Sequence, residues 1–300
     1  MIKVLVTGAA GQVGRDLVDV LLGYTPPGGS ETWHPDGRAV HSDEFAVVGL
    51  THHDLDVTDE AAVHRAIRAV QPDVIVHLAA YTAVDQAESD SERCFAVNER
   101  GTGYLSDAAD STGAHLVTVS TDYVFDGAGN RPYSESDTTN PLGVYGRSKL
   151  AGELRCRPRD TIVRTSWVMG IRGRNVLHVI AQRVAAGEPV RFVNDQIGTP
   201  TFSADLARGL ATFVRERPSG VWHFANQPAT SWYEVAVSAA EACGATRDFV
   251  TPITSGELTP APAARRPSYS ALSTEKWVAA GFREPLEWRD GLARFFRDRS

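Results

Sequence analysis

The chain has 300 residues, of which 42% are hydrophobic and 22% charged, and its formal net charge is −7. This length supports one large domain or two closely joined lobes, and the apolar content excludes wholesale disorder. The negative charge gives no general attraction to nucleic acid or to an anionic membrane surface, so we expect neither as a partner and favour a small-molecule ligand.

The first half of the chain alternates short runs rich in β-branched residues with longer segments of helical period. Strands are expected at residues 2–6, 45–50, 74–78, 116–120 and 161–164. Helices are expected at residues 12–22, 60–70, 90–112 and 145–155. This alternation predicts an α/β fold, namely a Rossmann-type doubly wound parallel sheet.

Two parts of the chain lack this alternation of strands and helices. Residues 24–43 are rich in proline, glycine and polar residues and are interpreted as a surface loop. Beyond about Trp167, short helices and strands are separated by proline-containing loops. We therefore expect residues 1–165 to form the doubly wound domain. Residues 166–300 should form mainly a smaller C-terminal substrate-binding lobe, with some segments returning to the first domain.

Features of the chain also predict its location. The three cysteines, Cys94, Cys156 and Cys243, have neither the spacing of a zinc site nor an obvious disulfide framework. The N-terminus enters a strand pattern at once, and no stretch is long enough to span a bilayer. We expect a cytoplasmic protein whose thiols stay reduced.

A glycine-rich turn directly follows the first predicted strand. Gly8, Gly11 and Gly14 have the spacing Gly-x-x-Gly-x-x-Gly between a strand and a helix. Glycines permit a tight turn and let backbone N–H groups at a helix N-terminus approach a pyrophosphate. This context favours a dinucleotide site over an incidental turn, so residues 1–165 are expected to bind NAD(P).

The end of the second strand bears on the choice of cofactor. A carboxylate there would bind the adenosine ribose and favour NAD, but the strand is followed by Thr51, His52 and His53. The absence of an acid favours NADPH, and NADH stays open. Further on, Asp56 either meets the adenine amino group or belongs to the N-cap region of the next helix.

Tyr145 and Lys149 stand four residues apart and so lie on one face of a helix. A nearby cation stabilises tyrosinate, which predicts a lowered pKa for Tyr145 and a phenol that can protonate a developing alkoxide. Thr121 follows a buried strand at its carboxyl end, where ligands lie in open α/β sheets. We expect its hydroxyl to meet both the substrate carbonyl and the Tyr145 hydroxyl.

Several sequence blocks carry a resemblance to known families. Residues 8–14, 78–80, 120–125 and 145–149, together with Asn98, resemble the extended short-chain dehydrogenase/reductase superfamily. Within it, residues 83–88, 120–127, 164–167, 194–201 and 264–267 closely resemble the dTDP-4-dehydrorhamnose reductase family. The similarity runs nearly end to end, and residues 24–43 are the main departure from it.

This resemblance implies NADPH- or NADH-dependent reduction of the C4 keto group of a dTDP-4-keto-6-deoxyhexose. Tyr145 would protonate the oxygen, and Lys149 would bind the nicotinamide ribose and tune Tyr145. The other implied cofactor-binding residues are Gly8, Gly11, Gln12, Val13, Gly14, Asp56, Val57, Leu78, Ala79, Ala80 and Val119. The implied substrate-binding residues are Thr121, Asp122, Trp167, Arg265 and Arg266.

The resemblance also raises the question of a metal ion. Some members of the family bind Mg²⁺ through glutamates at a homodimer contact, one of them just after the glycine turn. Here that position holds Asp16, preceded by Arg15. A shorter carboxylate beside a cation makes Asp16 a weak candidate ligand.

Alternative functions remain to be separated. A dehydratase is disfavoured because Tyr123, rather than glutamate, follows Asp122. An epimerase stays open, since a Tyr/Lys pair can serve it, but Trp167 and residues 194–201 favour the reductase. A reductase of the dihydrostreptose type stays open, and so does a non-catalytic NADP-binding regulatory subunit, although the complete catalytic set argues against the latter.

Overall fold

The computed structural model describes residues 1–298 and is built around a sheet of six parallel strands. In spatial order these are β10 (Gly220–His223), β5 (Thr161–Thr165), β4 (His115–Thr121), β3 (Val74–His77), β1 (Ile2–Thr7) and β2 (Phe45–Leu50). Each neighbouring pair is parallel. The predicted Rossmann-type α/β fold is therefore confirmed.

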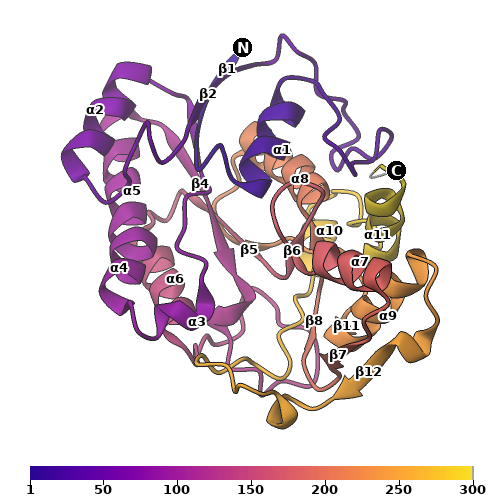
Figure 1. Ribbon diagram of the computed structural model, residues 1–300. Coiled ribbons are helices and arrows are strands. Elements are labelled where there is room, and N and C mark those ends of the chain that lie inside the picture. Colours follow the sequence, from indigo (N-terminus) through magenta and orange to yellow (C-terminus); the bar gives the residue numbers. More distant parts are fainter. Residues whose placement is uncertain (299–300) are drawn as a thin grey trace.

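Helices cover both faces of this sheet (Figure 1). One face packs against α1 (Gln12–Leu21) and α8 (Ser203–Glu216). The other packs against α2 (Glu60–Val70), α5 (Gly101–Thr112) and α6 (Val144–Arg155). Because both faces are covered, the central strands are continuous apolar runs rather than alternating ones. Within residues 1–298, no helix combines the length and apolar character needed to cross a membrane.

The helix predicted at residues 90–112 is interrupted. It consists of α4 (Ser91–Phe95), a π-helical turn at Ala96–Arg100 and then α5. Asn98 lies in this turn and is fully buried. Wider turns of this kind are frequent at functional sites. The expectation of one continuous helix over residues 90–112 did not include this turn.

Residues 24–43 have no helix or strand, as predicted, but they are more than a surface loop. Trp33 is buried, and its Nε1 donates to the carbonyl of Glu284 at 3.2 Å. Arg215 of α8 donates to Asp36 at 2.8 Å and to Glu44 at 2.5 Å. The segment is thus held by an apolar anchor and by ion pairs to distant parts of the chain.

The C-terminal part forms a second apolar cluster beside the sheet. It contains α7 (Val176–Ala186), α9 (Trp232–Ala242) and α11 (Trp288–Arg297). Short strand pairs complete it: β6 (Val168–Met169) with β9 (Thr201–Phe202), β7 (Val190–Val193) with β12 (Val250–Ile253), and β8 (Ile197–Gly198) with β11 (Thr230–Ser231). In contrast, α8, β10 and α10 (Glu275–Ala279) pack with the main sheet.

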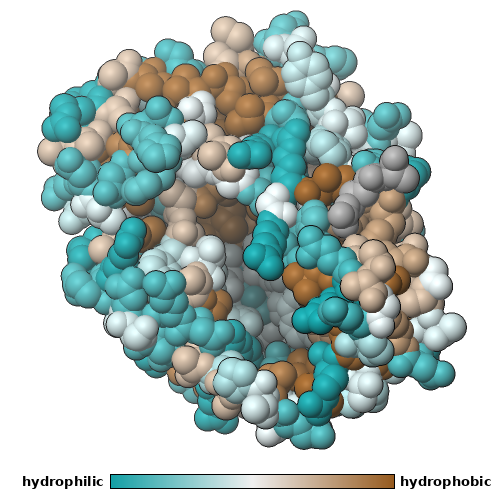
Figure 2. All heavy atoms as spheres, viewed as in Figure 1, coloured by the Kyte–Doolittle hydropathy of each residue, from teal (hydrophilic) through white to brown (hydrophobic). Residues whose placement is uncertain are grey.

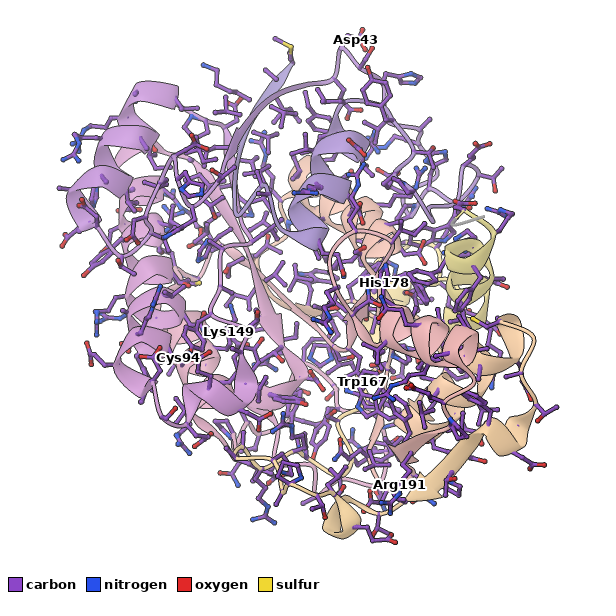
Figure 3. All side chains as sticks on the ribbon, in the orientation of Figure 1. Asp43, Cys94, Lys149, Trp167, His178 and Arg191 are labelled. Carbon is purple, nitrogen blue, oxygen red and sulfur yellow. The ribbon has the colours of Figure 1, made fainter. Side chains whose placement is uncertain are left out.

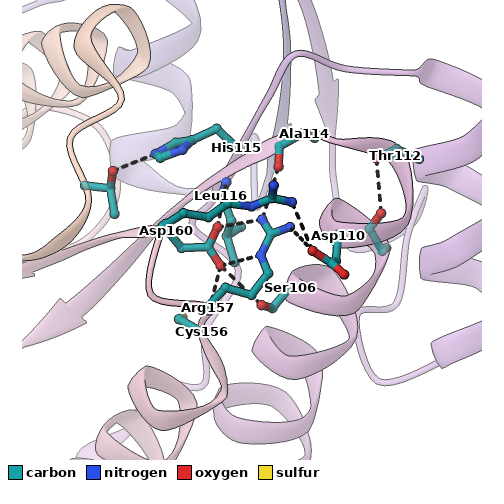
Figure 4. A network of polar contacts seen from close by, with 12 residues as sticks. Ser106, Asp110, Thr112, Ala114, His115, Leu116, Cys156, Arg157 and Asp160 are labelled. Atoms are coloured by element: carbon teal, nitrogen blue, oxygen red, sulfur yellow. Dashed lines mark hydrogen bonds and ion pairs between the residues drawn. The ribbon is translucent and has the colours of Figure 1, made fainter.

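A buried ionic network secures the strands that carry the candidate site (Figure 4). Asp160 is completely buried and accepts from Arg157 Nη2 at 2.6 Å, from Ser106 at 3.2 Å and from the Leu116 amide at 3.3 Å. A buried charge is tolerated only when it is paired and hydrogen-bonded in this way. The network therefore ties α5, β4 and the turn before β5 together.

Candidate active site

A cleft formed by two adjoining cavities lies at the carboxyl ends of the strands. Gly8, Gly11, Leu78, Ala80 and Thr82 line both cavities, so the two are continuous. We name them the β2-side cavity and the β4-side cavity. Figure 2 shows this face of the molecule hollowed near its middle. All the predicted cofactor residues line one cavity or the other: Gly8, Gly11, Gln12, Val13, Gly14, Asp56, Val57, Leu78, Ala79, Ala80, Val119, Tyr145 and Lys149.

The glycine turn has the geometry of a pyrophosphate cradle. Gly8 has a φ of +69°, and a Cβ there would lie 2.7 Å from the amide nitrogen of Ala79. A Cβ on Gly14 would collide with the Gly8 carbonyl. Helix α1 begins directly after Gly11 without a side-chain cap, so its first N–H groups stay available to an anion. The turn therefore fits the diphosphate of a dinucleotide.

The structure separates the two interpretations of Asp56. The N-cap of α2 is Asp59, which accepts from the Ala62 amide at 2.9 Å. Asp56 lies in the preceding turn and accepts from the amide and hydroxyl of Thr58 at 2.9 and 2.7 Å. These bonds hold the pKa of Asp56 below its usual value. A charged carboxylate therefore borders the β2-side cavity.

Thr121, Tyr145 and Lys149 meet in the β4-side cavity, and the Thr121 hydroxyl hydrogen-bonds the Tyr145 phenol. Burial raises the pKa of Tyr145 well above its usual value; this hydrogen bond opposes the rise and nearby Asp122 adds to it. The predicted direction for Tyr145 is therefore wrong here, because desolvation outweighs any help from a cation. Burial lowers the pKa of Lys149 to about 8, with opposition from Glu153.

Buried polar contacts hold the helix that carries Tyr145 and Lys149. At its start, Glu88 accepts from the Val144 amide at 2.7 Å. Further along α6, Asn98 donates to Ser148 at 2.9 Å. Near its end, Glu153 accepts from Arg164 of β5 at 2.7 and 3.0 Å. These three attachments, to the loop after α3 (Val84–Ala87), to the π turn and to the sheet, fix the orientation of the two side chains.

Asp122 was predicted to hold the sugar, but its two oxygens already have partners. Its Oδ2 accepts from Ser270 at 2.5 Å and its Oδ1 from Thr121 at 3.1 Å. Burial raises the pKa of Asp122 to about 7. Asp122 thus joins Thr121 to a C-terminal loop, and direct contact with the sugar stays a prediction.

Trp167 belongs to an aromatic wall that sequence reasoning found only in part. Its ring stacks on Trp232, with centroids 4.0 Å apart, and both line the β4-side cavity. Figure 3 labels Lys149 and Trp167 on the two sides of this cavity. Trp167 has a φ of +47°, and a Cβ on Gly198 would lie 2.5 Å from its ring. Such backbone strain in a bulky residue is typical of functional sites. Trp232 was missed because an aromatic residue at a helix start also suits a core.

The two arginines predicted to bind the substrate have different surroundings. Arg266 donates to both carboxylate oxygens of Asp85, at 2.5 and 2.7 Å, and its side chain is 19% exposed. Arg265 is exposed and lines a small cavity together with Tyr123 and Tyr145. Of these two arginines, Arg265 lies beside the candidate catalytic tyrosine, and no carboxylate within residues 1–298 forms an ion pair with its guanidinium.

Asp16 does not fit a magnesium ligand. It is buried, its Oδ2 accepts from Ser203 at 2.5 Å, and its Oδ1 lies 3.4 Å from Arg172. Burial raises the pKa of Asp16 to about 6. Across the described residues 1–298, no group of three or more His, Cys, Asp or Glu side chains is placed to hold a metal ion. Asp16 instead ties α1 to α8.

Comparison with known proteins identifies the family. The family described as the RmlD substrate binding domain matches residues 37–300. A dTDP-4-dehydrorhamnose reductase from Streptomyces griseus is 40% identical over 97% of this chain and 92% of its own length. A dTDP-4-keto-6-deoxy-D-glucose reductase from Streptomyces niveus is 37% identical, covering 97% and 96%. The crystal structure of dTDP-4-dehydrorhamnose reductase from Bacillus anthracis in complex with NADP superposes with a TM-score of 0.88 at 32% identity, covering 99% of both chains. With the cleft and its side chains as described, this chain belongs to the dTDP-4-dehydrorhamnose reductase family.

Proposed function

We propose that this protein uses NADPH to reduce the C4 keto group of a dTDP-4-keto-6-deoxyhexose. The observation that carries the proposal is the meeting of Thr121, Tyr145 and Lys149 in a cavity continuous with the glycine turn. The names of the relatives and the NADP held by the Bacillus anthracis enzyme support it. The lack of an acid at the end of β2 favours NADPH over NADH.

The two parts of the chain divide the work in this proposal. Residues 1–165, joined by the returning segment 203–223, bind the cofactor. The glycine turn would hold its diphosphate, with Asp56 and Val57 beside the adenine and Lys149 at the nicotinamide ribose. The lobe within residues 166–300 supplies Trp167, Trp232 and Arg265 to the sugar nucleotide. When bound, NADPH supplies the hydride that reaches the sugar C4.

Tyr145 supplies the proton in this reaction. Its raised pKa keeps the phenol protonated at neutral pH, which suits an acid that acts only when a strongly basic alkoxide develops on the substrate. When the substrate is bound, the Thr121 hydroxyl, which donates to Asp122 in this structure, would turn to donate to the carbonyl oxygen beside that phenol. The Lys149 ammonium stabilises the tyrosinate left after the transfer.

One experiment separates this proposal from its alternatives. The protein is mixed with NADPH and dTDP-4-keto-6-deoxyglucose, and NADPH absorbance is followed while NMR identifies the product. We expect stoichiometric oxidation of NADPH and a new C4 carbinol. A changed sugar configuration without net NADPH consumption would indicate an epimerase. Binding of NADPH without any turnover would indicate a regulatory subunit. The NMR spectrum also settles which sugar is made.

A matched pair of variants tests the substrate side. Arg265→Ala should weaken the binding of dTDP and dTDP-sugars about tenfold or more, because a hydrogen bond to a charged group contributes about 1.5–3 kcal/mol. Arg266→Ala should affect dTDP binding less and thermal stability more, because its guanidinium is held by Asp85. Calorimetric titration of each variant with dTDP and with NADPH measures binding, and a thermal melt of each variant measures stability. Unchanged dTDP affinity in Arg265→Ala would remove Arg265 from the site.

We also place the protein in the cytoplasm. Cys94, Cys156 and Cys243 are present as thiols, and thiols persist in a reducing compartment. The homodimer that the family resemblance implied stays a prediction, and Mg²⁺ has no part in the proposed mechanism because Asp16 does not fit it.

A further inference from the structure

A shallow cavity beside the glycine turn takes no part in the mechanism described above. It adjoins the β2-side cavity, because Ala10 lines both cavities. In addition, Thr51 lines the shallow cavity and the next residue, His52, lines the β2-side cavity. It lies between the start of α1 and the carboxyl end of β2. Its lining residues are Ala9, Ala10, Arg15, Val18, Asp19, Gly49, Thr51 and Arg172.

Two arginines and one acid line this cavity. Arg15 projects from the first turn of α1 and is exposed. Arg172 comes from the loop after β6, and its side chain is 26% exposed. It donates to Asp19 at 2.6 Å and lies 3.4 Å from Asp16. These contacts hold the Arg172 guanidinium at the cavity, and they also neutralise Asp19, the acid that lines it.

A third nearby carboxylate, that of Asp54, is engaged by Thr51. Asp54 accepts from the amide and the hydroxyl of Thr51 at 2.9 and 2.7 Å. His52 follows on the rim of the adjoining cavity. Among residues 1–298, no carboxylate forms an ion pair with Arg15, so this cationic group remains available and the cavity favours an anion despite the net charge of −7 of the whole chain.

We propose that Arg15 binds the 2′-phosphate of NADPH, while Arg172 neutralises Asp19 beside it, and that this arrangement determines the preference for NADPH over NADH. The proposal rests on the proposed use of this cofactor. A dinucleotide whose diphosphate lies on the glycine turn has its adenosine ribose at the end of β2, and an arginine near that point accommodates a 2′-phosphate. The guanidinium fork matches phosphate oxygens.

Small residues leave room for this group. Ala9 and Ala10 form one wall, and Gly49 forms another. A Cβ on Gly49 would lie 3.0 Å from that of Ala9, so a side chain there would narrow the cavity. The small residues leave space for a phosphate in this cavity, and neither the diphosphate nor the nicotinamide of the cofactor would occupy that space.

The test compares two nucleotide pairs that differ only in this phosphate. Binding of NADPH, NADH, 2′,5′-ADP and 5′-AMP to the full-length protein is measured by calorimetry without any sugar. Arg15→Ala and Arg172→Ala should each weaken NADPH and 2′,5′-ADP about tenfold or more and leave NADH and 5′-AMP within about twofold. Arg174→Ala is the matched control, because Arg174 is exposed in the same loop but does not line the cavity.

Further variants make the result decisive. Asp19→Asn should strengthen NADPH binding, because a negative charge leaves the cavity and Arg172 is released. If Arg172→Ala fails to fold, Arg15→Ala and Arg15→Glu decide alone. Equal losses for NADPH and NADH, or no loss in Arg15→Ala, would overturn the proposal. The binding test contains no sugar, so its outcome does not depend on turnover. Failure to reduce a dTDP-keto-sugar would therefore overturn the proposed function and leave this inference standing.

Discussion

Replacing Tyr145 with phenylalanine should lower turnover of the keto-sugar by about 10²–10⁴-fold and leave NADPH affinity nearly unchanged. The change removes one oxygen and leaves the ring to pack edge-on against Tyr123, with centroids 5.9 Å apart. It removes the proton donor without removing a contact that folding requires. Steady-state kinetics with dTDP-4-keto-6-deoxyglucose and calorimetry with NADPH give both quantities.

Tyr123→Phe is the control for this experiment. Tyr123 lines the same cavity, and its replacement by phenylalanine also removes only a hydroxyl. This hydroxyl contacts Arg266 rather than Thr121. Its effect on turnover should be far smaller than that of Tyr145→Phe. If Tyr145→Phe kept near-normal turnover, the proton would come from another group and the proposed mechanism would be wrong, although the fold would stand.

Replacing Lys149 with methionine should damage both turnover and cofactor binding. The ammonium has two roles in the proposal, as a ligand of the nicotinamide ribose and as the charge that stabilises tyrosinate. We expect turnover to fall by about 10²-fold or more and NADPH affinity by about tenfold. Methionine suits the buried position, and Glu153 keeps Arg164 as its partner, so the protein should remain folded. A thermal melt checks this, and an unchanged NADPH affinity would contradict the ribose contact.

The pH dependence provides a second test of Lys149. Burial lowers its pKa to about 8, so the free protein loses this charge as the pH rises through that value. NADPH affinity and kcat/KM, which report on the free enzyme, should therefore fall on the basic side. The Lys149→Met variant should lack this basic limb. A limb retained in the variant would assign it to another group.

Local pattern explains which parts of this protein could be predicted from sequence. Five strands of the sheet, the glycine turn and the Tyr145–Lys149 pair depend on neighbours in the chain, so hydrophobic period and short spacing are sufficient to find them. The sixth strand, β10, is only Gly220–His223, and its parallel pairing with β5 depends on the long crossover connection through residues 166–219, which no local pattern records. The burial of Trp33 could not be predicted from local pattern either, because residues far along the chain, such as Glu284, cover its ring.

Within the site, the sequence by itself determined which chemical groups are present. The tertiary structure decided their burial, their partners and their pKa values. Arg265 and Arg266 are adjacent and look alike in sequence, yet Asp85, 181 residues from Arg266, engages only Arg266. The pKa of Tyr145 likewise rises because folding removes water from the phenol, an effect that outweighs the expected influence of Lys149. Residue identity and spacing are local properties, whereas burial and long-range pairing exist only once the chain has folded, because desolvation depends on every element that packs around a group.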